Sequence, residues 1–236
     1  MLIHTKAIVL SKLKYRDNDL IVRCYTQQKG ILSFMVRGIF KSKKSTAKSA
    51  YFQPLSQLYL IVDYKENHSL QSIKETKPAM VYSSLHTNVI KASVVMFLSE
   101  VLTYVLKEEE ANAILYSYLE TTLSWFDEQN NFANFHLLFL LNLTKYLGFY
   151  PDIKHIDYPY FNLTDGKFSL YKSTVSTQDV VLLKQLLNSK FDGLSELKIH
   201  SKQRKSFLSI LLTYYGLHLG DFKKPKSLTV LNQVFN

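Results

Sequence analysis

The chain has 236 residues, of which 47% are hydrophobic, so it can bury a sizeable core in one large domain or in two to three small ones. Its formal net charge of +10 favours a polyanionic partner. The single cysteine, Cys24, excludes an internal disulfide and a cysteine-ligated zinc cluster, and no apolar run reaches the ~18 residues of a membrane-spanning helix.

The positive charge is concentrated at the two ends of the chain. Residues 1–80 have a net charge of +9, residues 81–160 of −5 and residues 161–236 of +6. A membrane surface is also a polyanion, but no basic amphipathic helix accompanies the basic N-terminal region, so we expect no membrane contact. The N-terminus lacks a secretory h-region, and we therefore expect a cytoplasmic protein.

Residues 1–77 are predicted to be all-β, and Pro78 is predicted to end the sheet. Runs of alternating polar and apolar residues are separated by short polar turns, the pattern of antiparallel strands. Five strands in under 80 residues have the spacing of a small closed barrel, which is the size of an OB-fold. The predicted strands are Leu2–Lys14, Leu20–Thr26, the segment that begins at Gly30, Phe52–Tyr64 and Leu70–Glu75.

The segment between Gly30 and Tyr51 combines a strand with a basic stretch. Leu32, Phe34 and Val36 share one face of the strand, which predicts that Phe34 belongs to the core. The strand leads into a stretch without any acid, for which small polar spacers predict a mobile loop that adds nothing to the core. Such a loop is either solvated surface or a phosphate-binding element. Its cations are Arg37, Lys41, Lys43, Lys44 and Lys48.

From Ala79 onward the hydrophobic spacing becomes helical. The apolar run Phe135–Leu143 is predicted to lie at the centre of a helical core, and the helical spacing of Trp125, Phe126, Phe132 and Phe139 favours core packing over base stacking. The predicted elements are helices Val81–Lys107, Ala111–Glu128 and one from the Asn130-Asn131 cap to Leu147, with a break at Glu108-Glu109-Glu110, then a hairpin of Tyr160–Leu163 and Lys167–Tyr171, helices Thr177–Ser189 and Ser201–Leu219, and a basic tail, Lys223–Lys226.

Sequence patterns of catalysis are lacking. There is no phosphate-binding glycine loop, nucleophile elbow or metalloprotease motif, and the seven histidines are scattered. Asp17 and Asp19 could chelate Mg²⁺ as a nuclease would need, but a turn rich in Asp and Asn needs no such explanation, and the polar turn is the favoured interpretation. Cys24 lies in a strand-like run and is predicted to be a buried bystander. We expect no catalytic residue, no metal and no cofactor, with a Mg²⁺-dependent nuclease as the enzyme alternative.

Several motifs resemble one protein family along most of the chain. The N-terminal ones are Tyr15–Asp19 followed by Ile21-Val22, Gly30, Arg37-Gly38 before the lysine-rich stretch, and Phe52–Leu55. Later ones are Tyr146–Asp152, Tyr215 with His218-Leu219, and Lys226–Leu228. Together they resemble the bacterial DNA repair and recombination mediator family RecO.

The resemblance implies an α+β protein with an N-terminal five-stranded OB-fold barrel, followed by a helical domain with a small β-hairpin insertion. The implied domains are a DNA-binding OB-fold at 1–78, a helical domain at 79–148, and at 149–236 a hairpin segment plus C-terminal helices packing on the helical domain. Such proteins are non-enzymatic mediators that bind single- and double-stranded DNA and anneal complementary strands. Their implied partners are the acidic tail of single-strand DNA-binding protein, RecR and, indirectly, RecA, in the nucleoid of the cytoplasm.

One departure from the family concerns zinc. Many members carry two Cys-x-x-Cys pairs after the segment that resembles Tyr146–Asp152, where this chain has Ile156 and Pro159 at the first pair's position. The resemblance therefore implies a member without zinc. Its segment is expected to be held by the packing of Tyr158, Tyr160, Phe161 and Phe168.

Single-strand binders combine a cationic groove with aromatic faces on which bases stack. The predicted nucleic-acid-binding residues are Lys14, Arg16, Arg37, Phe40, Lys41, Lys43, Lys44, Lys48 and Tyr51. A second basic group, Lys198, Lys202, Arg204 and Lys205, is either an extension of the nucleic-acid path, a receptor for an acidic tail or a solvated helix start. Since phosphate contacts and stacking do not distinguish sugars, an RNA-binding OB-fold module is the second alternative.

Overall fold

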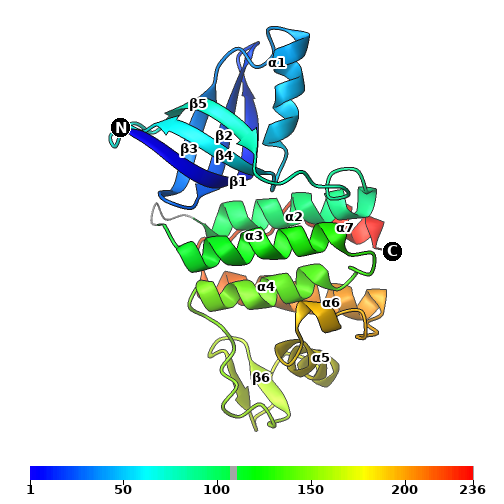
Figure 1. Ribbon diagram of the computed structural model, residues 1–236. Coiled ribbons are helices and arrows are strands. Elements are labelled where there is room, and N and C mark those ends of the chain that lie inside the picture. Colours follow the sequence, from blue (N-terminus) through cyan, green and yellow to red (C-terminus); the bar gives the residue numbers. More distant parts are fainter. Residues whose placement is uncertain (107–110, 236) are drawn as a thin grey trace. The chain divides into compact units, whose positions relative to one another are not determined.

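The computed structural model describes residues 1–106 and 111–235, which form two compact units, 1–128 and 129–236 (Figure 1). The first unit contains a β-barrel and two helices, and the second contains helices and a small hairpin. The boundary between the units lies inside the helical domain expected at residues 79–148. The expected three-part division stays a prediction.

The N-terminal strands form a closed five-stranded barrel, as predicted, and its strand order is that of an OB-fold. Its five strands close in the order β1-β2-β3-β5-β4, and β3 and β5 are the parallel neighbours. Ala7, Val22 and Phe34 are completely buried inside it, with Leu32 and Val36 packed against them. The strands are β1 (Leu2–Tyr15), β2 (Asp19–Thr26), β3 (Gly30–Val36), β4 (Gln57–Asp63) and β5 (Gln71–Pro78).

The basic stretch after β3 is helical, so the predicted mobile loop is wrong. Helix α1 (Lys43–Lys48) runs into a 3-10 turn, η1 (Ser49–Phe52). Ser42 caps the helix: its Oγ accepts from the Ser45 backbone N–H at 3.2 Å, and the Ser42 N–H donates to Ser45 Oγ at 3.0 Å. Ile39 and Phe52 are buried in the barrel core at the two ends of the stretch. Because Phe52 closes the core, β4 starts at Gln57 instead of at Phe52 as predicted.

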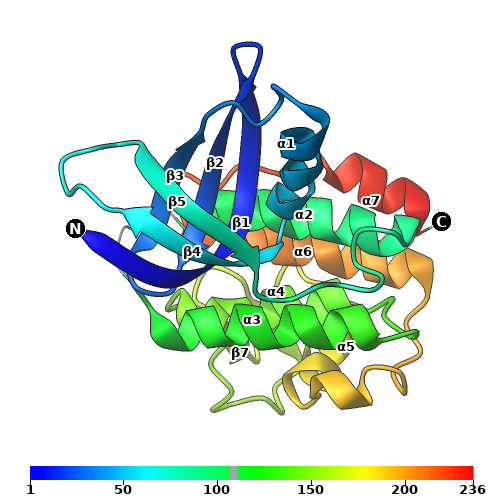
Figure 2. The same ribbon diagram turned by 45° about the horizontal axis from the view of Figure 1, so that its top comes forward.

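Two helices complete the first unit, α2 (Val89–Val105) and α3 (Ala113–Glu128). Helix α2 begins later than the predicted Val81 because Asn88 caps it, with its side chain accepting from the N–H groups of Ile90 and Lys91 at 3.0 and 3.1 Å. The predicted break at Glu108–Glu110 lies outside the described residues. Figure 2 shows both helices together with the barrel strands.

A carboxylate joins the segment after the barrel to the end of α3. The two oxygens of Asp127 accept from the backbone N–H groups of Ser83, Ser84 and Leu85, each at 2.8 Å. The buried Lys91 ammonium donates to the Asp127 carbonyl at 2.7 Å. Burial alone would raise the pKa of Asp127, but the three N–H donors outweigh it and hold the pKa at about 2. This joint fixes residues 83–85 within the first unit.

The second unit is mainly helical, and most of its elements were predicted within a few residues. Helix α4 is buried on nearly all sides as expected, although it begins after Asn134 and not at Asn130-Asn131. Phe126 of the first unit and Phe139 of the second are completely buried, whereas Trp125 and Phe132 are half-buried. The elements are α4 (Phe135–Tyr146), β6 (Tyr160–Asn162), β7 (Lys167–Ser169), α5 (Thr177–Leu187), the 3-10 turn η2 (Phe191–Gly193), α6 (Ser201–His218) and α7 (Leu228–Val234).

The β6–β7 hairpin is held by aromatic rings. Phe161 and Phe168 are both buried, and their ring centroids lie 5.0 Å apart. Tyr158 is half-buried and stacks on His155 at 4.8 Å, and Tyr160 is also half-buried. The expected packing is thus confirmed for the two phenylalanines. Within residues 1–106 and 111–235 no three His, Cys, Asp or Glu side chains form a metal-binding group, and no helix there is long and apolar enough to cross a membrane.

Candidate nucleic-acid interface

The turn between β1 and β2 is tied to the segment that leaves β3. The Gly38 N–H donates to Asp19 Oδ1 at 2.8 Å, and the Phe40 N–H donates to the Asn18 carbonyl at 3.2 Å. These bonds bring together two basic segments that the sequence separates by about 20 residues. They also give Asp19 a structural role, as expected of a polar turn.

Cations lie over aromatic rings at this end of the barrel. Lys14 Nζ is 5.8 Å from the centroid of the half-buried Phe40 ring, and the guanidinium carbon of Arg16 is 5.2 Å from that of Tyr15. Both cations are exposed. We call Lys14, Arg16, Phe40 and Lys41 the rim group. Its charged ends reach solvent, and the rings of Phe40 and the neighbouring Tyr15 lie beneath Lys14 and Arg16. This arrangement is expected of a surface that receives phosphates and bases.

A hollow of about 560 Å³ opens beside the rim, between β3, α1 and β5. It exists because β3 and β5 pair only through Phe34–Gln71 and Met35–Ser72 and then separate. Strand β5 also has a bulge, since Ile61 pairs with Glu75 and Val62 with Ile73, which leaves Lys74 without a partner in the ladder. We call this cavity the α1 hollow.

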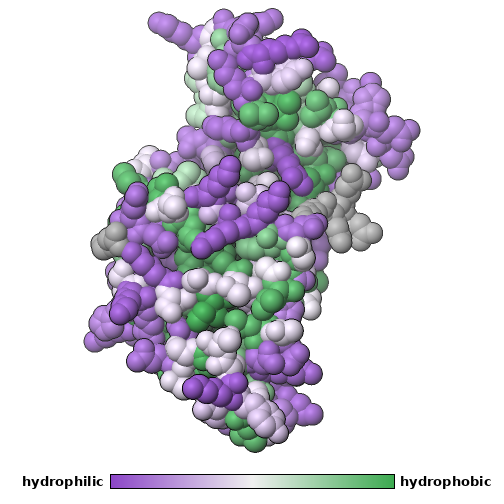
Figure 3. Space-filling model, turned by 180° about the vertical axis from the view of Figure 1, so that it is seen from behind, coloured by the Kyte–Doolittle hydropathy of each residue, from purple (hydrophilic) through white to green (hydrophobic). Residues whose placement is uncertain are grey.

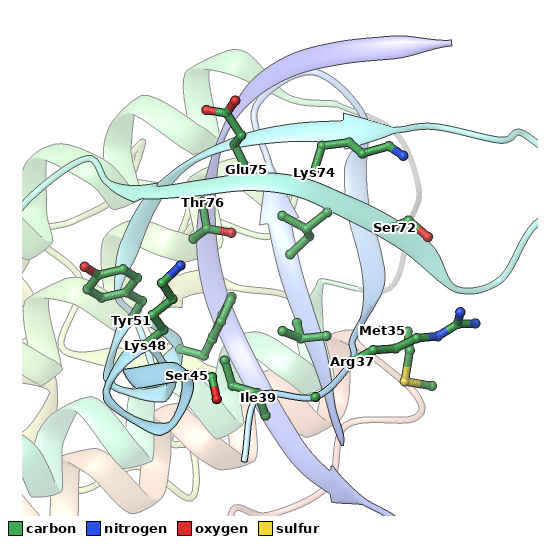
Figure 4. A pocket seen from close by; sticks show the side chains of 14 residues that line it. Met35, Arg37, Ile39, Ser45, Lys48, Tyr51, Ser72, Lys74, Glu75 and Thr76 are labelled. Atoms are coloured by element: carbon green, nitrogen blue, oxygen red, sulfur yellow. The ribbon is translucent and has the colours of Figure 1, made fainter. Parts of the chain in front are cut away.

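The α1 hollow is lined by three cations, Arg37, Lys48 and Lys74, and by the half-buried ring of Tyr51. Figure 4 shows Lys48 and Tyr51 side by side, with Thr76 of β5 pointing toward them. Glu75 also borders the hollow, but its side chain points away from Lys48 and Tyr51 in the same view. The hollow therefore offers an aromatic face and net positive charge to a ligand.

The predicted site residues thus fall into three sets. The rim group and the α1 hollow contain seven of them, and Lys43 and Lys44 project from α1 as exposed side chains that do not line the hollow. Lys44 and Lys48 are one helical turn apart, so they share a helix face. On the face seen in Figure 3, hydrophilic side chains gather at the upper end of the barrel unit. The part of each residue in binding stays a prediction.

Lys74 is the cation that sequence reasoning missed. It lies in β5, which the sequence presents as an ordinary strand far from the lysine-rich stretch. The strand order of an OB-fold could have identified Lys74, because that order places β5 next to β3. Applying the strand order to the predicted strands would have placed the strand of Lys74 next to the strand that leads into Arg37.

The second basic group, in the other unit, contains one residue that is turned inward. The Arg204 guanidinium donates to Asn134 Oδ1 at 2.9 Å and to the Ile199 carbonyl at 3.1 Å. It therefore holds the starts of α4 and α6. Lys198 and Lys202 are exposed, and Lys205 is half-buried.

Cys24 is a buried bystander, as predicted. Its side chain is completely buried in the barrel core, and burial raises the pKa of the thiol far above its ordinary value. A thiol that stays protonated is not a nucleophile at neutral pH.

Comparison with known proteins gives a consistent result along the chain. The family model described as recombination protein O N terminal matches residues 1–82, and the one described as recombination protein O C terminal matches residues 86–228. Proteins named DNA repair protein RecO from Flavobacterium johnsoniae, Flavobacterium psychrophilum and Bacteroides fragilis are 45%, 46% and 37% identical to the chain, with complete coverage of both sequences.

Proposed function

Since the chain belongs to the recombination protein O family, we propose that it is a DNA repair and recombination protein that binds DNA strands and anneals them without breaking covalent bonds. In this proposal it binds single- and double-stranded DNA and helps to load the recombinase RecA on strands coated with single-strand DNA-binding protein. RecR is its proposed partner, and the nucleoid in the cytoplasm is its proposed location.

The observation that carries the proposal is the position of the α1 hollow and the rim group on an OB-fold barrel. Arg37, Lys48, Lys74 and the Tyr51 ring line one hollow, and Lys14 lies over the Phe40 ring. Cations along a groove neutralise phosphates, and each base that stacks on a ring contributes about 1–3 kcal/mol. Both features are present on one surface of the barrel.

Annealing follows from electrostatics in this proposal. Two strands repel each other through their phosphates, and lysines that neutralise phosphates on both strands lower that repulsion. The exposed Lys43 and Lys44 on α1 neutralise further phosphates of the strand that the α1 hollow holds, so that a second strand can approach it. Few bases are engaged by rings, so most base edges remain free to pair.

The second unit offers a place for the acidic tail of single-strand DNA-binding protein. Lys198, Lys202 and Lys205 lie near the start of α6, and charge complementarity would guide an acidic peptide to them. Removing these lysines should weaken the response to coated strands and leave annealing of bare strands nearly unchanged.

The test is annealing of complementary oligonucleotides, bare or coated with single-strand DNA-binding protein, in chelator or in Mg²⁺. The proposal predicts faster annealing in both metal conditions and full-length strands at the end. Mg²⁺-dependent shortening of the strands would indicate a nuclease, and acceleration confined to RNA strands would indicate an RNA-binding module. Annealing at the rate of the protein-free reaction would contradict the proposal.

A further inference from the structure

The outer face of β1, β4 and β5 carries a second hollow, of about 370 Å³. Strand register places Tyr59 of β4 between Lys6 of β1 and Lys77 of β5, with Ile61 beside it in the next row between His4 and Glu75. Lys6 Nζ is 5.8 Å from the centroid of the Tyr59 ring. We call this surface the Tyr59 face.

Tyr59 is the exposed ring of this face. Its exposed fraction is 50%, whereas its strand neighbours Leu58 and Leu60 are each 1% exposed in the barrel. A half-exposed ring flanked by two lysines across the strands resembles the combination of ring and cations in the α1 hollow. It suits an unstacked base with a phosphate beside it.

The Tyr59 face continues from the α1 hollow. Glu75 lines both hollows, so only the width of β5 separates them. Along β5 the basic residues Lys74 and Lys77 lie on the two sides of Glu75, one at each hollow. A strand that leaves the α1 hollow across β5 therefore reaches Tyr59 next.

The charges on the Tyr59 face differ in how firmly they are held. Lys6 bonds to Glu120 at 2.8 Å, with both side chains about one-third exposed or less, which fixes Lys6 beside the ring. Lys77 lies 3.8 Å from Glu75, and their side chains are 76% and 58% exposed. Such an exposed pair is weak and exchanges readily with other partners. A phosphate can therefore compete with Glu75 for Lys77.

We propose that the Tyr59 face is a second contact site for single-stranded nucleic acid, in which Tyr59 stacks on a base and Lys77 receives a phosphate. The strand reaches it from the α1 hollow by crossing β5. This inference rests on the proposed function, because the α1 hollow must hold the strand first. Glu75 weakens the binding of such a strand, because its carboxylate repels the phosphates that pass between the hollows.

The test measures binding of single-stranded oligonucleotides from about 4 to about 16 nucleotides, the range of site sizes for one OB-fold. Tyr59→Ala should weaken binding of the longest strands by about fivefold or more and leave the shortest unchanged, because one stacked base is lost. Tyr59→Phe keeps the ring and should bind like the wild type. Glu75→Gln should strengthen binding of the long strands. Tyr171→Ala, at a tyrosine with 84% exposure in the other unit, is the control.

A second readout locates the contact directly. A long strand carrying 5-iodouracil should photocrosslink to the peptide that contains Tyr59, whereas a short strand should not. Wild-type affinity of Tyr59→Ala at every length, without a crosslink, overturns the inference. An equal loss at all lengths also overturns it, since Tyr59 would then support the first site. If instead Arg37→Ala with Lys48→Ala leaves short-strand binding unchanged, the proposed function fails.

Discussion

Two regions of the molecule use aromatic rings in opposite ways. In the segment that follows β3, beside the β1–β2 turn, the Phe40 ring is half-buried and lies under the exposed Lys14 ammonium. In the β6–β7 hairpin, Phe161 and Phe168 are 2% and 4% exposed and pack on each other. The first arrangement leaves ring edges and charges for a ligand, and the second uses the rings entirely for stability. Lys184 Nζ also lies 5.5 Å from the centroid of the Phe168 ring, so a nearby cation indicates binding here only where the ring itself is accessible.

The largest expected effect is a difference in stability between variants of the two regions. Phe161→Ala should lower the free energy of unfolding by about 3–5 kcal/mol, because a buried ring leaves a cavity. Phe40→Ala removes a half-buried ring and should cost roughly 1 kcal/mol of stability while weakening single-strand binding by about 1–3 kcal/mol. Urea unfolding and binding titrations measure both. If Phe161→Ala instead weakened DNA binding at unchanged stability, the contrast would be wrong.

A smaller effect on stability tests the hydrogen bonds that Asp127 makes within the first unit. The pKa of Asp127, about 2, lies below the ordinary 3.8, so its bonds stabilise the fold above about pH 4. That contribution, roughly 2 kcal/mol, should be lost as the pH falls toward 2. Asp127→Asn should flatten this part of the stability curve, as measured by urea unfolding at a series of pH values. An unchanged acid limb would show that the bonds to residues 83–85 contribute nothing.

A still smaller effect tests how closely the glycine in the β6–β7 turn packs against its neighbours. Gly148 and Gly166 both have positive φ, 83° and 64°. A Cβ on Gly166 would lie 2.5 Å from the Tyr214 hydroxyl, which donates to the Phe149 carbonyl, whereas one on Gly148 would meet nothing within 4 Å. Gly166→Ala should therefore cost about 1 kcal/mol more than Gly148→Ala, the value of one hydrogen bond. Equal melting temperatures for the two variants would contradict this packing.

The smallest effect expected concerns zinc. Because Phe161 and Phe168 hold the hairpin and the ligand cysteines are replaced, metal analysis should find far less than one zinc per chain. Incubation with a strong chelator should not change the melting temperature. A stoichiometric zinc that stabilises the protein would show that other side chains bind it.

The sequence predicts those elements that carry a clear period or a strong stop signal. The five strands, the Asp165-Gly166 hairpin and the buried helix α4 follow from alternation, a turn dipeptide and an apolar run. Helix α1 was missed because its stability comes from the Ser42–Ser45 capping box and from Ile39 and Phe52, which close the core from its two ends. The lysines between Ile39 and Phe52 made this segment resemble a solvated loop, so neither the capping box nor the two buried ends was recognised.

The candidate site was predicted in composition but not in arrangement. Arg37, Lys48 and Tyr51 line one hollow because β3 and β5 separate beyond Met35 and leave space between them, a property of strand pairing that no local pattern shows. Lys74 lines the same hollow because the strand order places β5 next to β3. Arg204 does not belong to the exposed part of the second basic group, because its guanidinium donates to Asn134. Long-range pairing therefore decides which cations meet, and residue spacing alone does not.

The central claim is that the cations of the α1 region neutralise phosphates of a single strand. The most direct measurement is the salt dependence of single-strand affinity for the variant with Lys41, Lys43 and Lys44 replaced by alanine. Each contacted phosphate contributes about −0.7 to the slope of log K against log salt, so the slope should become shallower by about 2. Unfolding free energy should hardly change, since these side chains are exposed.

The matched control removes three exposed lysines of the other unit, Lys154, Lys172 and Lys190, and thereby changes the net charge equally. We predict a wild-type slope for this control and a shallower slope for the α1 variant. A wild-type affinity and slope for the α1 variant, or the same loss in both variants, would contradict the account.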